Sequence, residues 1–185
     1  MRKIPTPFAG LFLIEPRVFP DERGHFFEAY HETKLADLGI TEKFVQVNQS
    51  FSHAGVLRGL HFQKNPHAQS KIIRCLRGSM YDVVVDIRHG SPTYGKWYGV
   101  ELSAENKLMM YVPFGFAHGF YALTDCEMMY MVGGGNWNRE SESGIRYDDP
   151  AVGITWPVKG QPIVHAKDAA LGGIESLTKI FEYTL

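Results

Sequence analysis

The sequence contains two cysteines, Cys75 and Cys126, in 185 residues. So few cysteines exclude a disulfide-rich scaffold and favour a reducing compartment. The sequence also lacks the apolar run of about 18–20 residues that a membrane-spanning helix requires. The short apolar segment near the N-terminus is interrupted by Glu15 and Pro16, which argues against a signal peptide. We therefore expect a cytoplasmic protein with no membrane partner.

An excess of charge of either sign is missing as well, because 19 Lys and Arg residues balance 20 Asp and Glu residues. A nucleic-acid-binding surface needs a basic excess on one face, so nucleic acid is not an expected partner. An anionic ligand would have to be bound by a few local cations. With 44% hydrophobic residues, the chain is long enough for one domain with a real core, and we expect a single domain over residues 1–185.

Helical patterns are scarce, and we expect one helix near the start, in YHETKLADLGI (30–40), ending at Gly39. Short β-type runs separated by turn residues make up most of the rest. The expected strands span residues 44–51, 56–63, 70–78, 79–88, 95–103, 108–116, 118–123 and 126–132. This spacing predicts an antiparallel sandwich or barrel, whose open mouth offers a concave site lined by inward-facing side chains.

Two segments lack the regular alternation of short strands and turns. Residues 133–150, GGGNWNRESESGIRYDDP, are expected to form a long loop at the rim of the barrel, where function is often carried. From about residue 157 the chain is expected to form a tail that wraps back over the body. Little regular structure is expected in this tail, apart from a short helix around residues 174–181.

Polar side chains interrupt the apolar runs, most clearly in GVLRGLHFQ (55–63). Arg58 and His61 would face opposite sides of a regular strand, and a bulge or sharp twist at Gly59 would re-aim one of them. Taken singly, a strand lysine is usually exposed and a strand histidine usually structural. Several such residues inside one barrel instead indicate a wet pocket or a site for an anionic ligand. The other members of this set are Gln46, Asn48, Gln63, Lys71, His118 and Tyr130.

The segment PFGFAH (113–118) has the Pro-x-Gly-x-x-His form of the second cupin motif. A metal-binding cupin also needs two histidines two residues apart, followed by a carboxylate. Here the matching positions are His61, Gln63 and Lys71. Glutamine replaces the second histidine, and the lysine would repel a divalent cation. We therefore expect no metal and no cofactor, which leaves His61 free to act as a base.

Several longer motifs follow one another in order: FPDERGHFFE (19–28), FVQVNQS (44–50), GVLRGLHFQ (55–63), AQSKIIRCLRG (68–78), DVVVDIRHGSPTYGKW (82–97), VPFGFAHGF (112–120), GIRYDDPAVGITWP (144–157) and AKDAA (166–170). On these motifs the chain, from about residue 4 to about residue 170, resembles the dTDP-4-dehydrorhamnose 3,5-epimerase family, the metal-free cupins of dTDP-L-rhamnose synthesis. The resemblance implies a mainly-β fold, a cupin (double-stranded β-helix, jelly-roll) barrel with a few short helices. It also implies a homodimer, with the N-terminal strand region (about 1–50) at the interface and a C-terminal wrapping tail (about 157–185).

The activity that the resemblance implies is epimerisation at C3 and C5 of dTDP-4-keto-6-deoxy-D-glucose, giving dTDP-4-keto-L-rhamnose. It implies a base at His61 held by Asp168, an acid at Tyr130, and Lys71 near the C4 oxygen of the sugar. The family stacks its thymine base on an aromatic residue after the catalytic tyrosine, and Trp137 in GGGNW can serve there. The remaining substrate-binding positions are Arg23, Glu28, Gln46, Asn48, Arg58, His118, Glu142 and Lys167.

The sequence departs from the family pattern at Val47, where an aspartate is usual, and in the GGGNW segment. The stretch between His118 and Tyr130 is also one residue shorter than the common form. These departures leave open a 3-epimerase acting at C3 only and a sugar-nucleotide-binding cupin without turnover. A metal cupin is a further alternative, against which Gln63 argues.

Overall fold

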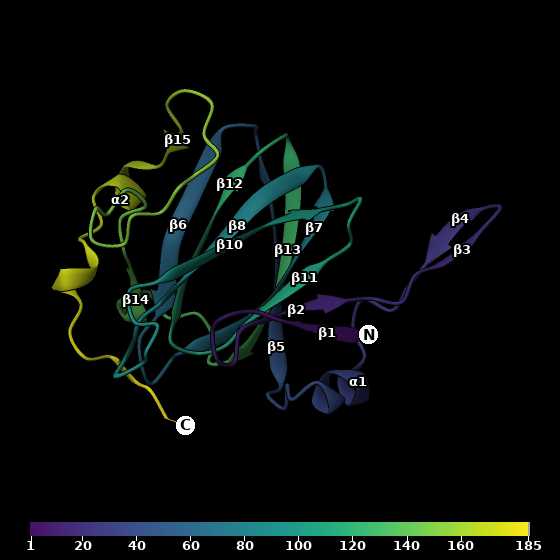
Figure 1. The fold of residues 1–185 in the computed structure, drawn as a ribbon, viewed down its shortest axis with the longest axis horizontal. Coiled ribbons are helices and arrows are strands. Elements are labelled where there is room, and N and C mark those ends of the chain that lie inside the picture. Colours follow the sequence, from purple (N-terminus) through teal and green to yellow (C-terminus); the bar gives the residue numbers. More distant parts are fainter. Residues whose placement is uncertain (185) are drawn as a thin grey trace.

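The computed structural model describes residues 1–184, so the last residue of the predicted C-terminal tail lies outside the described residues. Two β-sheets face each other and form the body of the molecule (Figure 1). The strand order is β1-β2-β11-β7-β13-β5 in the first sheet and β10-β8-β12-β6-β14 in the second, where β15 also pairs with β6. The expectation of a mainly-β protein with few short helices is confirmed.

The bounds of the elements follow the chain closely. The first sheet contains β1 (Arg2–Pro5), β2 (Phe12–Glu15), β5 (Phe44–Ser52), β7 (Gln69–Arg77), β11 (Met109–Val112) and β13 (Cys126–Gly134). The second contains β6 (Val56–Gln63), β8 (Ser79–Asp86), β10 (Trp97–Ser103), β12 (Phe116–Ala122), β14 (Glu142–Gly144) and β15 (Ile163–Val164). Two small pairs are β3 (Phe19–Asp21) with β4 (Gly24–Phe26), and β9 (Arg88–His89) with β16 (Phe181–Glu182). The helices are α1 (Glu32–Asp37) and α2 (Ala166–Ala169), with 3-10 turns η1 (Arg139–Ser141) and η2 (Ile174–Ser176).

Alternation along the strands separates the core into layers. In β8, Met80 and Val84 belong to one buried cluster, whereas Val83 and Val85 belong to another. The first cluster also contains Ile73 of β7, from the other sheet, and therefore fills the space between the sheets. The second lies on the outer side of β8 and is completed by residues of the C-terminal segment. A third cluster packs α1 against the outer side of the first sheet.

Most of the expected strands are confirmed within about two residues, but the strand expected over 108–116 is wrong. It is cut in two because Gly115 has a φ of +85° in a turn after Pro113, so β11 ends at Val112 and β12 begins at Phe116. The helix in 30–40 is confirmed over Glu32–Asp37, with Gly39 at a φ of +95° just beyond it.

The two irregular segments contain more structure than expected. Residues 133–150 are not one long loop, because β13 extends to Gly134 and β14 pairs with β6. The tail contains β15, α2 and β16, and the helix expected around 174–181 is only the 3-10 turn η2. In the part of the chain that the structure describes, no helix is both long and apolar enough to cross a membrane.

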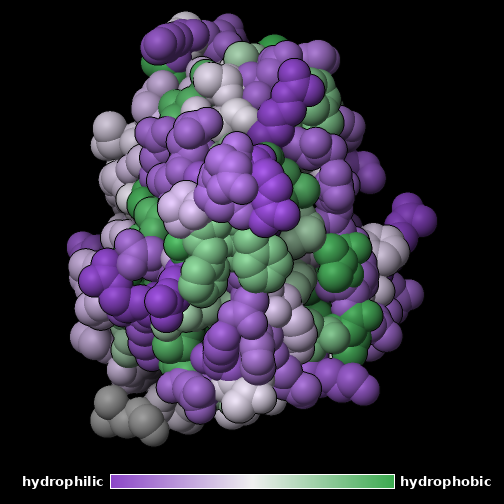
Figure 2. All heavy atoms as spheres, turned by 90° about the vertical axis from the view of Figure 1, so that its right-hand side faces the viewer, coloured by the Kyte–Doolittle hydropathy of each residue, from purple (hydrophilic) through white to green (hydrophobic). Residues whose placement is uncertain are grey.

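The β3–β4 hairpin projects from the body as an arm beyond the first sheet (Figure 1). The face on this side carries green apolar side chains among polar ones (Figure 2). Phe26 on the arm is 65% exposed, and Val47 on β5 is 61% exposed. Val45 and Phe51 are exposed on the same outward face of β5, which is the edge strand of its sheet. So many exposed apolar side chains mark a surface suited to a protein contact.

Candidate active site

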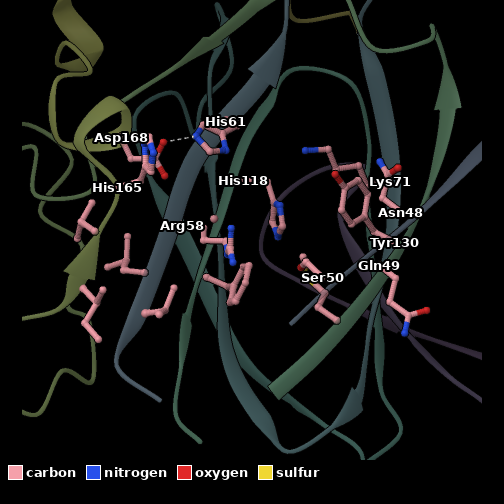
Figure 3. A pocket seen from close by; sticks show the side chains of 17 residues that line it. Asn48, Gln49, Ser50, Arg58, His61, Lys71, His118, Tyr130, His165 and Asp168 are labelled. Atoms are coloured by element: carbon pink, nitrogen blue, oxygen red, sulfur yellow. Dashed lines mark hydrogen bonds and ion pairs between the residues drawn. The ribbon is translucent and has the colours of Figure 1, made fainter. Parts of the chain in front are cut away.

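A cavity of about 600 Å³ lies between the two sheets. One wall is formed by β5, β7 and β13, and the other by β6 and β12 together with β15 and α2 (Figure 3). Its polar lining consists of Asn48, Gln49, Ser50, Arg58, His61, Lys71, His118, Tyr130, His165 and Asp168. Most of the polar strand residues selected from the sequence are therefore gathered in one place.

A bulge in β6 turns two of these residues to the same side. The register between β6 and β12 shifts between His118 and Phe120, where β6 carries one residue more than its partner. Gly59 lies in this bulge with a φ of +115°. As a result Arg58 and His61 both line the cavity, and the hypothesis made for Gly59 is confirmed. A Cβ atom on Gly59 would lie 2.5 Å from the backbone of β12, so the close approach requires glycine.

The side chain of His61 is held by the C-terminal segment. Its Nε2 lies 2.9 Å from Oδ1 of Asp168, and Oδ2 of Asp168 accepts the backbone N–H of Gly59 at 3.0 Å. The other ring nitrogen, Nδ1, points into the cavity (Figure 3). Because a carboxylate partner keeps the proton on Nε2, Nδ1 presents a free lone pair to the cavity. This arrangement suits a general base.

Asp168 reaches this position because a short strand anchors the tail beside β6. Ile163 donates its N–H to the carbonyl of Gly55 at 2.8 Å, and β15 runs parallel to β6. His165 then caps α2, and Asp168 on that helix is buried. Burial opposes ionisation of Asp168, but hydrogen bonds from His61 and Gly59 outweigh it and hold the pKa of the carboxyl below its ordinary value.

Tyr130 and Lys71 stand on the opposite wall, on the neighbouring strands β13 and β7. The Lys71 Nζ atom lies 5.6 Å from the centre of the Tyr130 ring. Its amine points across the cavity toward the two histidines (Figure 3). Burial lowers the pKa of Lys71 to about 8, although the nearby charges of Asp82 and Glu142 oppose the shift. The site therefore has a histidine on one wall, and a tyrosine and a lysine on the other.

A second histidine–carboxylate pair lies deeper between the sheets. His118 Nε2 is 2.7 Å from Oδ1 of Asp82, and both side chains are buried. Burial lowers the pKa of His118, against the opposing effect of Asp82. Asp82 was not among the candidates chosen from the sequence. The alternation of β8 gave a usable signal, because Asp82 shares the inward face of Val84.

The other candidates do not line the cavity. Arg23 pairs with Asp21 on the arm, and Glu28 pairs with Lys34. Trp137 is 55% exposed in the loop after β13. Lys167 is exposed on α2, and Glu142 on β14 is paired in register with Gln63. Gln46 is half-buried and donates a hydrogen bond to Asn48 at 2.8 Å. Their roles in substrate binding stay predictions.

The donor set of the cavity bears on metal chemistry. Across residues 1–184 there is no group of three or more His, Cys, Asp or Glu side chains placed to hold a metal ion. The side-chain oxygen of Gln63 accepts a hydrogen bond from the backbone N–H of Asn138 at 3.1 Å and so holds the loop after β13. The expectation of a metal-free site stays a prediction.

Comparison with known proteins places these features in context. The sequence profile described as dTDP-4-dehydrorhamnose 3,5-epimerase matches residues 5–176. The dTDP-4-dehydrorhamnose 3,5-epimerase of Salmonella typhimurium (strain LT2) is 46% identical over 168 residues, which is 90% of this chain and 92% of that protein. The epimerase RmlC from Legionella pneumophila Philadelphia 1, solved in complex with dTDP-4-keto-L-rhamnose, has a TM-score of 0.95 at 42% identity and covers 100% of this chain and 99% of that one. ChmJ, a 3'-monoepimerase from Streptomyces bikiniensis in complex with dTDP-quinovose, has a TM-score of 0.87 at 31% identity, over 94% and 88% of the two chains.

Proposed function

Because this chain belongs to the dTDP-4-dehydrorhamnose 3,5-epimerase family, we propose that it converts dTDP-4-keto-6-deoxy-D-glucose into dTDP-4-keto-L-rhamnose without a metal. The chain has the cupin fold of that family and is an isomerase, a nucleotide-sugar 3,5-epimerase. The observation that carries the more detailed proposal is the placement of the His61–Asp168 pair and of Tyr130 on opposite walls of one cavity.

The chemistry follows from the ketone at C4, which acidifies the C–H bonds at C3 and C5. His61 removes a proton from the carbon through Nδ1, and the electron pair of the C–H bond passes to the C4 oxygen to give an enolate. Asp168 stabilises the imidazolium that forms, because its carboxylate is 2.9 Å from Nε2. Tyr130 then delivers a proton to the other face of the same carbon, which inverts the centre. A base and an acid on opposite walls are what inversion requires.

The charge of the enolate needs a partner while it develops. The ammonium of Lys71 points into the cavity from the wall that also carries Tyr130 (Figure 3). Placed near the C4 oxygen, it stabilises the enolate more than the neutral ketone, and such differential stabilisation lowers the barrier. Lys71 is half-buried, and partial removal from water strengthens the interaction.

Two cations and an aromatic ring supply binding for the nucleotide. Arg58 lies on the cavity wall, with Nε bonded to Ser52 at 3.0 Å, and is held ready for the diphosphate. Lys167 on α2 is a second cation for that group. Trp137 stacks on the thymine base. Gln46, Asn48, His118 and Glu142 contact the sugar and the nucleoside.

The active unit is a homodimer in which the N-terminal region, about residues 1–50, lies at the interface. The projecting arm and the apolar outward face of β5 support this part of the proposal (Figures 1 and 2). Arg23 and Glu28 lie on and beside the arm, away from the cavity of their own chain, and complete the cavity of the second copy. Pairing exposed apolar edge strands across a two-fold axis is a common way to protect them.

The test is proton NMR of dTDP-4-keto-6-deoxy-D-glucose incubated in D₂O with protein treated with a chelator. Deuterium at both C3 and C5, with conversion to the L-rhamno product, supports the proposal. Deuterium at C3 alone would instead assign the activity of a monoepimerase, as in the structurally similar ChmJ. Exchange that appears only after a divalent metal is added would refute the metal-free mechanism. His61→Ala serves as the control for exchange that does not depend on the site.

A further inference from the structure

The interior face of β8 carries a carboxylate that the proposed mechanism does not use. Asp82 is 0% exposed and shares its face with Met80 and Val84 in the apolar cluster between the sheets. Its Oδ1 is bonded to Nε2 of His118 at 2.7 Å. Its Oδ2 has no hydrogen-bond partner among residues 1–184. Leaving one oxygen of a buried carboxylate without a partner is costly, so a role beyond the bond to His118 is expected.

This further role of Asp82 concerns the charge of Lys71. Its amine points from the opposite sheet toward His118, the hydrogen-bond partner of Asp82 (Figure 3). Of the nearby charges, that of Asp82 favours the protonated form of Lys71 most. Burial alone would drive Lys71 toward the neutral amine, because a charged group loses hydration inside the protein. A neutral amine stabilises an enolate far less than an ammonium does. The negative charge of Asp82 therefore opposes the loss of the Lys71 proton.

We propose that Asp82 is a positioning residue of the active site, which keeps Lys71 in its ammonium form and fixes the ring of His118 through one carboxylate. This inference rests on the proposed function of Lys71 as the group that stabilises the enolate. The bond to Asp82 places the His118 proton on Nε2, so that Nδ1 of His118 accepts hydrogen bonds from the substrate. Two histidine–aspartate pairs thereby serve different ends: Asp168 supports the base, and Asp82 supports the electrostatics of the enolate.

The charged and polar groups near Lys71 come from several strands. The two carboxylates that favour the ammonium are Asp82 on β8 and Glu142 on β14, in that order. His118 on β12 is coupled to both Lys71 and His61, and Tyr130 on β13 lies beside the amine. Since Asp82 raises the pKa of Lys71 more than Glu142 does, removing the charge of Asp82 should lower that pKa more than removing the charge of Glu142.

The test compares Asp82→Asn with Glu142→Gln and the unmutated protein. The rate at which acetic anhydride acetylates Lys71 is measured against pH by peptide mass spectrometry, without substrate. The unmutated protein should give a midpoint near pH 8. Asp82→Asn should lower it by about one unit or more, and Glu142→Gln by less. Exposed Lys43 is the internal control and should keep its midpoint in all three proteins.

The pH dependence of kcat/KM for deuterium incorporation provides the second readout. The basic limb of the profile should move to lower pH in Asp82→Asn by the same amount as the labelling midpoint. The proposal would be overturned if Lys71 of Asp82→Asn were acetylated with the same midpoint as in the unmutated protein and the basic limb did not move. Asp82 would then act only as the hydrogen-bond partner of His118. If the unmutated protein shows no exchange, the proposed function fails, whereas the labelling still tests the coupling of Asp82 to Lys71.

A measurement on the unmutated protein covers the case in which Asp82→Asn does not fold. The ¹³Cγ resonance of Asp82, assigned by backbone-correlated NMR, should shift with the same midpoint as the acetylation of Lys71. A resonance that stays constant through that pH range would contradict the coupling.

Discussion

Replacement of Asp168 by asparagine tests the tautomer of His61 with almost no change in volume. The backbone N–H of Gly59 points at Oδ2 of Asp168 at 3.0 Å, and this donor needs an acceptor. In Asp168→Asn the amide oxygen must therefore face Gly59, and the amide NH₂ group must face Nε2 of His61. His61 can satisfy that donor only by leaving Nε2 unprotonated, which moves its proton to Nδ1. The nitrogen that faces the cavity then carries a proton and no longer acts as a base.

The expected loss follows from the value of a positioned base. General acid–base catalysis contributes about 10²–10⁴-fold, and a wrong histidine tautomer costs about 10⁴-fold in kcat in a serine-protease triad. We expect kcat to fall about 10³-fold, which corresponds to about 4 kcal/mol in the activation barrier. Affinity for dTDP should change little, because Asp168 binds His61 and Gly59.

The assay is the initial rate of deuterium incorporation at C3 and C5, with dTDP affinity measured by calorimetry and folding by thermal melting. Asp148→Asn is the matched control, because that carboxylate is exposed and pairs with Arg146 at 2.6 Å outside the cavity. The control should keep nearly full activity. An Asp168→Asn variant that melts normally and retains more than a tenth of the wild-type kcat would refute the reasoning.

Three further substitutions probe other parts of the account. Tyr130→Phe should lower the rate of net inversion about 10²–10⁴-fold, because the variant cannot deliver the second proton. Deuterium exchange on the face of the sugar that His61 serves should persist. Equal losses of inversion and exchange, both measured by NMR, would contradict the placement of the base and the acid on separate walls. Gly59→Ala should lower the free energy of unfolding, measured with denaturant, by about 1–3 kcal/mol, because the new Cβ would lie 2.5 Å from the β12 backbone. An unchanged unfolding midpoint would instead show that the bulge can accommodate a side chain. Asp86→Asn should lower the melting temperature by about 6–12 °C, since it breaks the buried pair with Arg88. Burial opposes ionisation of Asp86, but its hydrogen bonds with Arg88, Thr93 and Ser91 outweigh burial and depress its pKa. The stability that the ionised Asp86 contributes is therefore present above its ordinary pKa of about 3.9. It is lost as the pH falls through the lower pKa of the folded state. The variant should therefore melt with a weaker acid dependence, and a dependence as steep as that of the wild type would exclude Asp86 as a source of acid lability.

The strands of the body could be predicted from the sequence because their signal is local. Alternation in MYDVVVDIR assigns the two faces of β8 correctly, and turn residues mark most of the strand ends. The one strand that failed, over 108–116, contains Gly115, whose positive φ turns the chain between two strands of different sheets. Periodicity does not report such a change of sheet when both halves are apolar.

The tail could not be predicted because its structure depends on distant partners. β15 has only two residues and exists through its pairing with β6, more than a hundred residues earlier. Asp168 on α2 entered the candidate site through the family resemblance alone, since an aspartate in AKDAA has no local feature that marks it. By contrast, the combination of Arg58, Gly59 and His61 in one strand already predicted the bulge that brings both side chains to the cavity.

The most direct test of the central claim is a crystal structure of the protein with bound dTDP-4-keto-L-rhamnose. We expect the sugar ring to lie between the two walls, with Nδ1 of His61 and the Tyr130 hydroxyl on opposite faces of the ring, each within about 3–3.5 Å of the carbon with which it exchanges a proton. The C4 oxygen should lie beside the Lys71 amine. A sugar ring bound outside the cavity, or His61 and Tyr130 on the same face of it, would contradict the account.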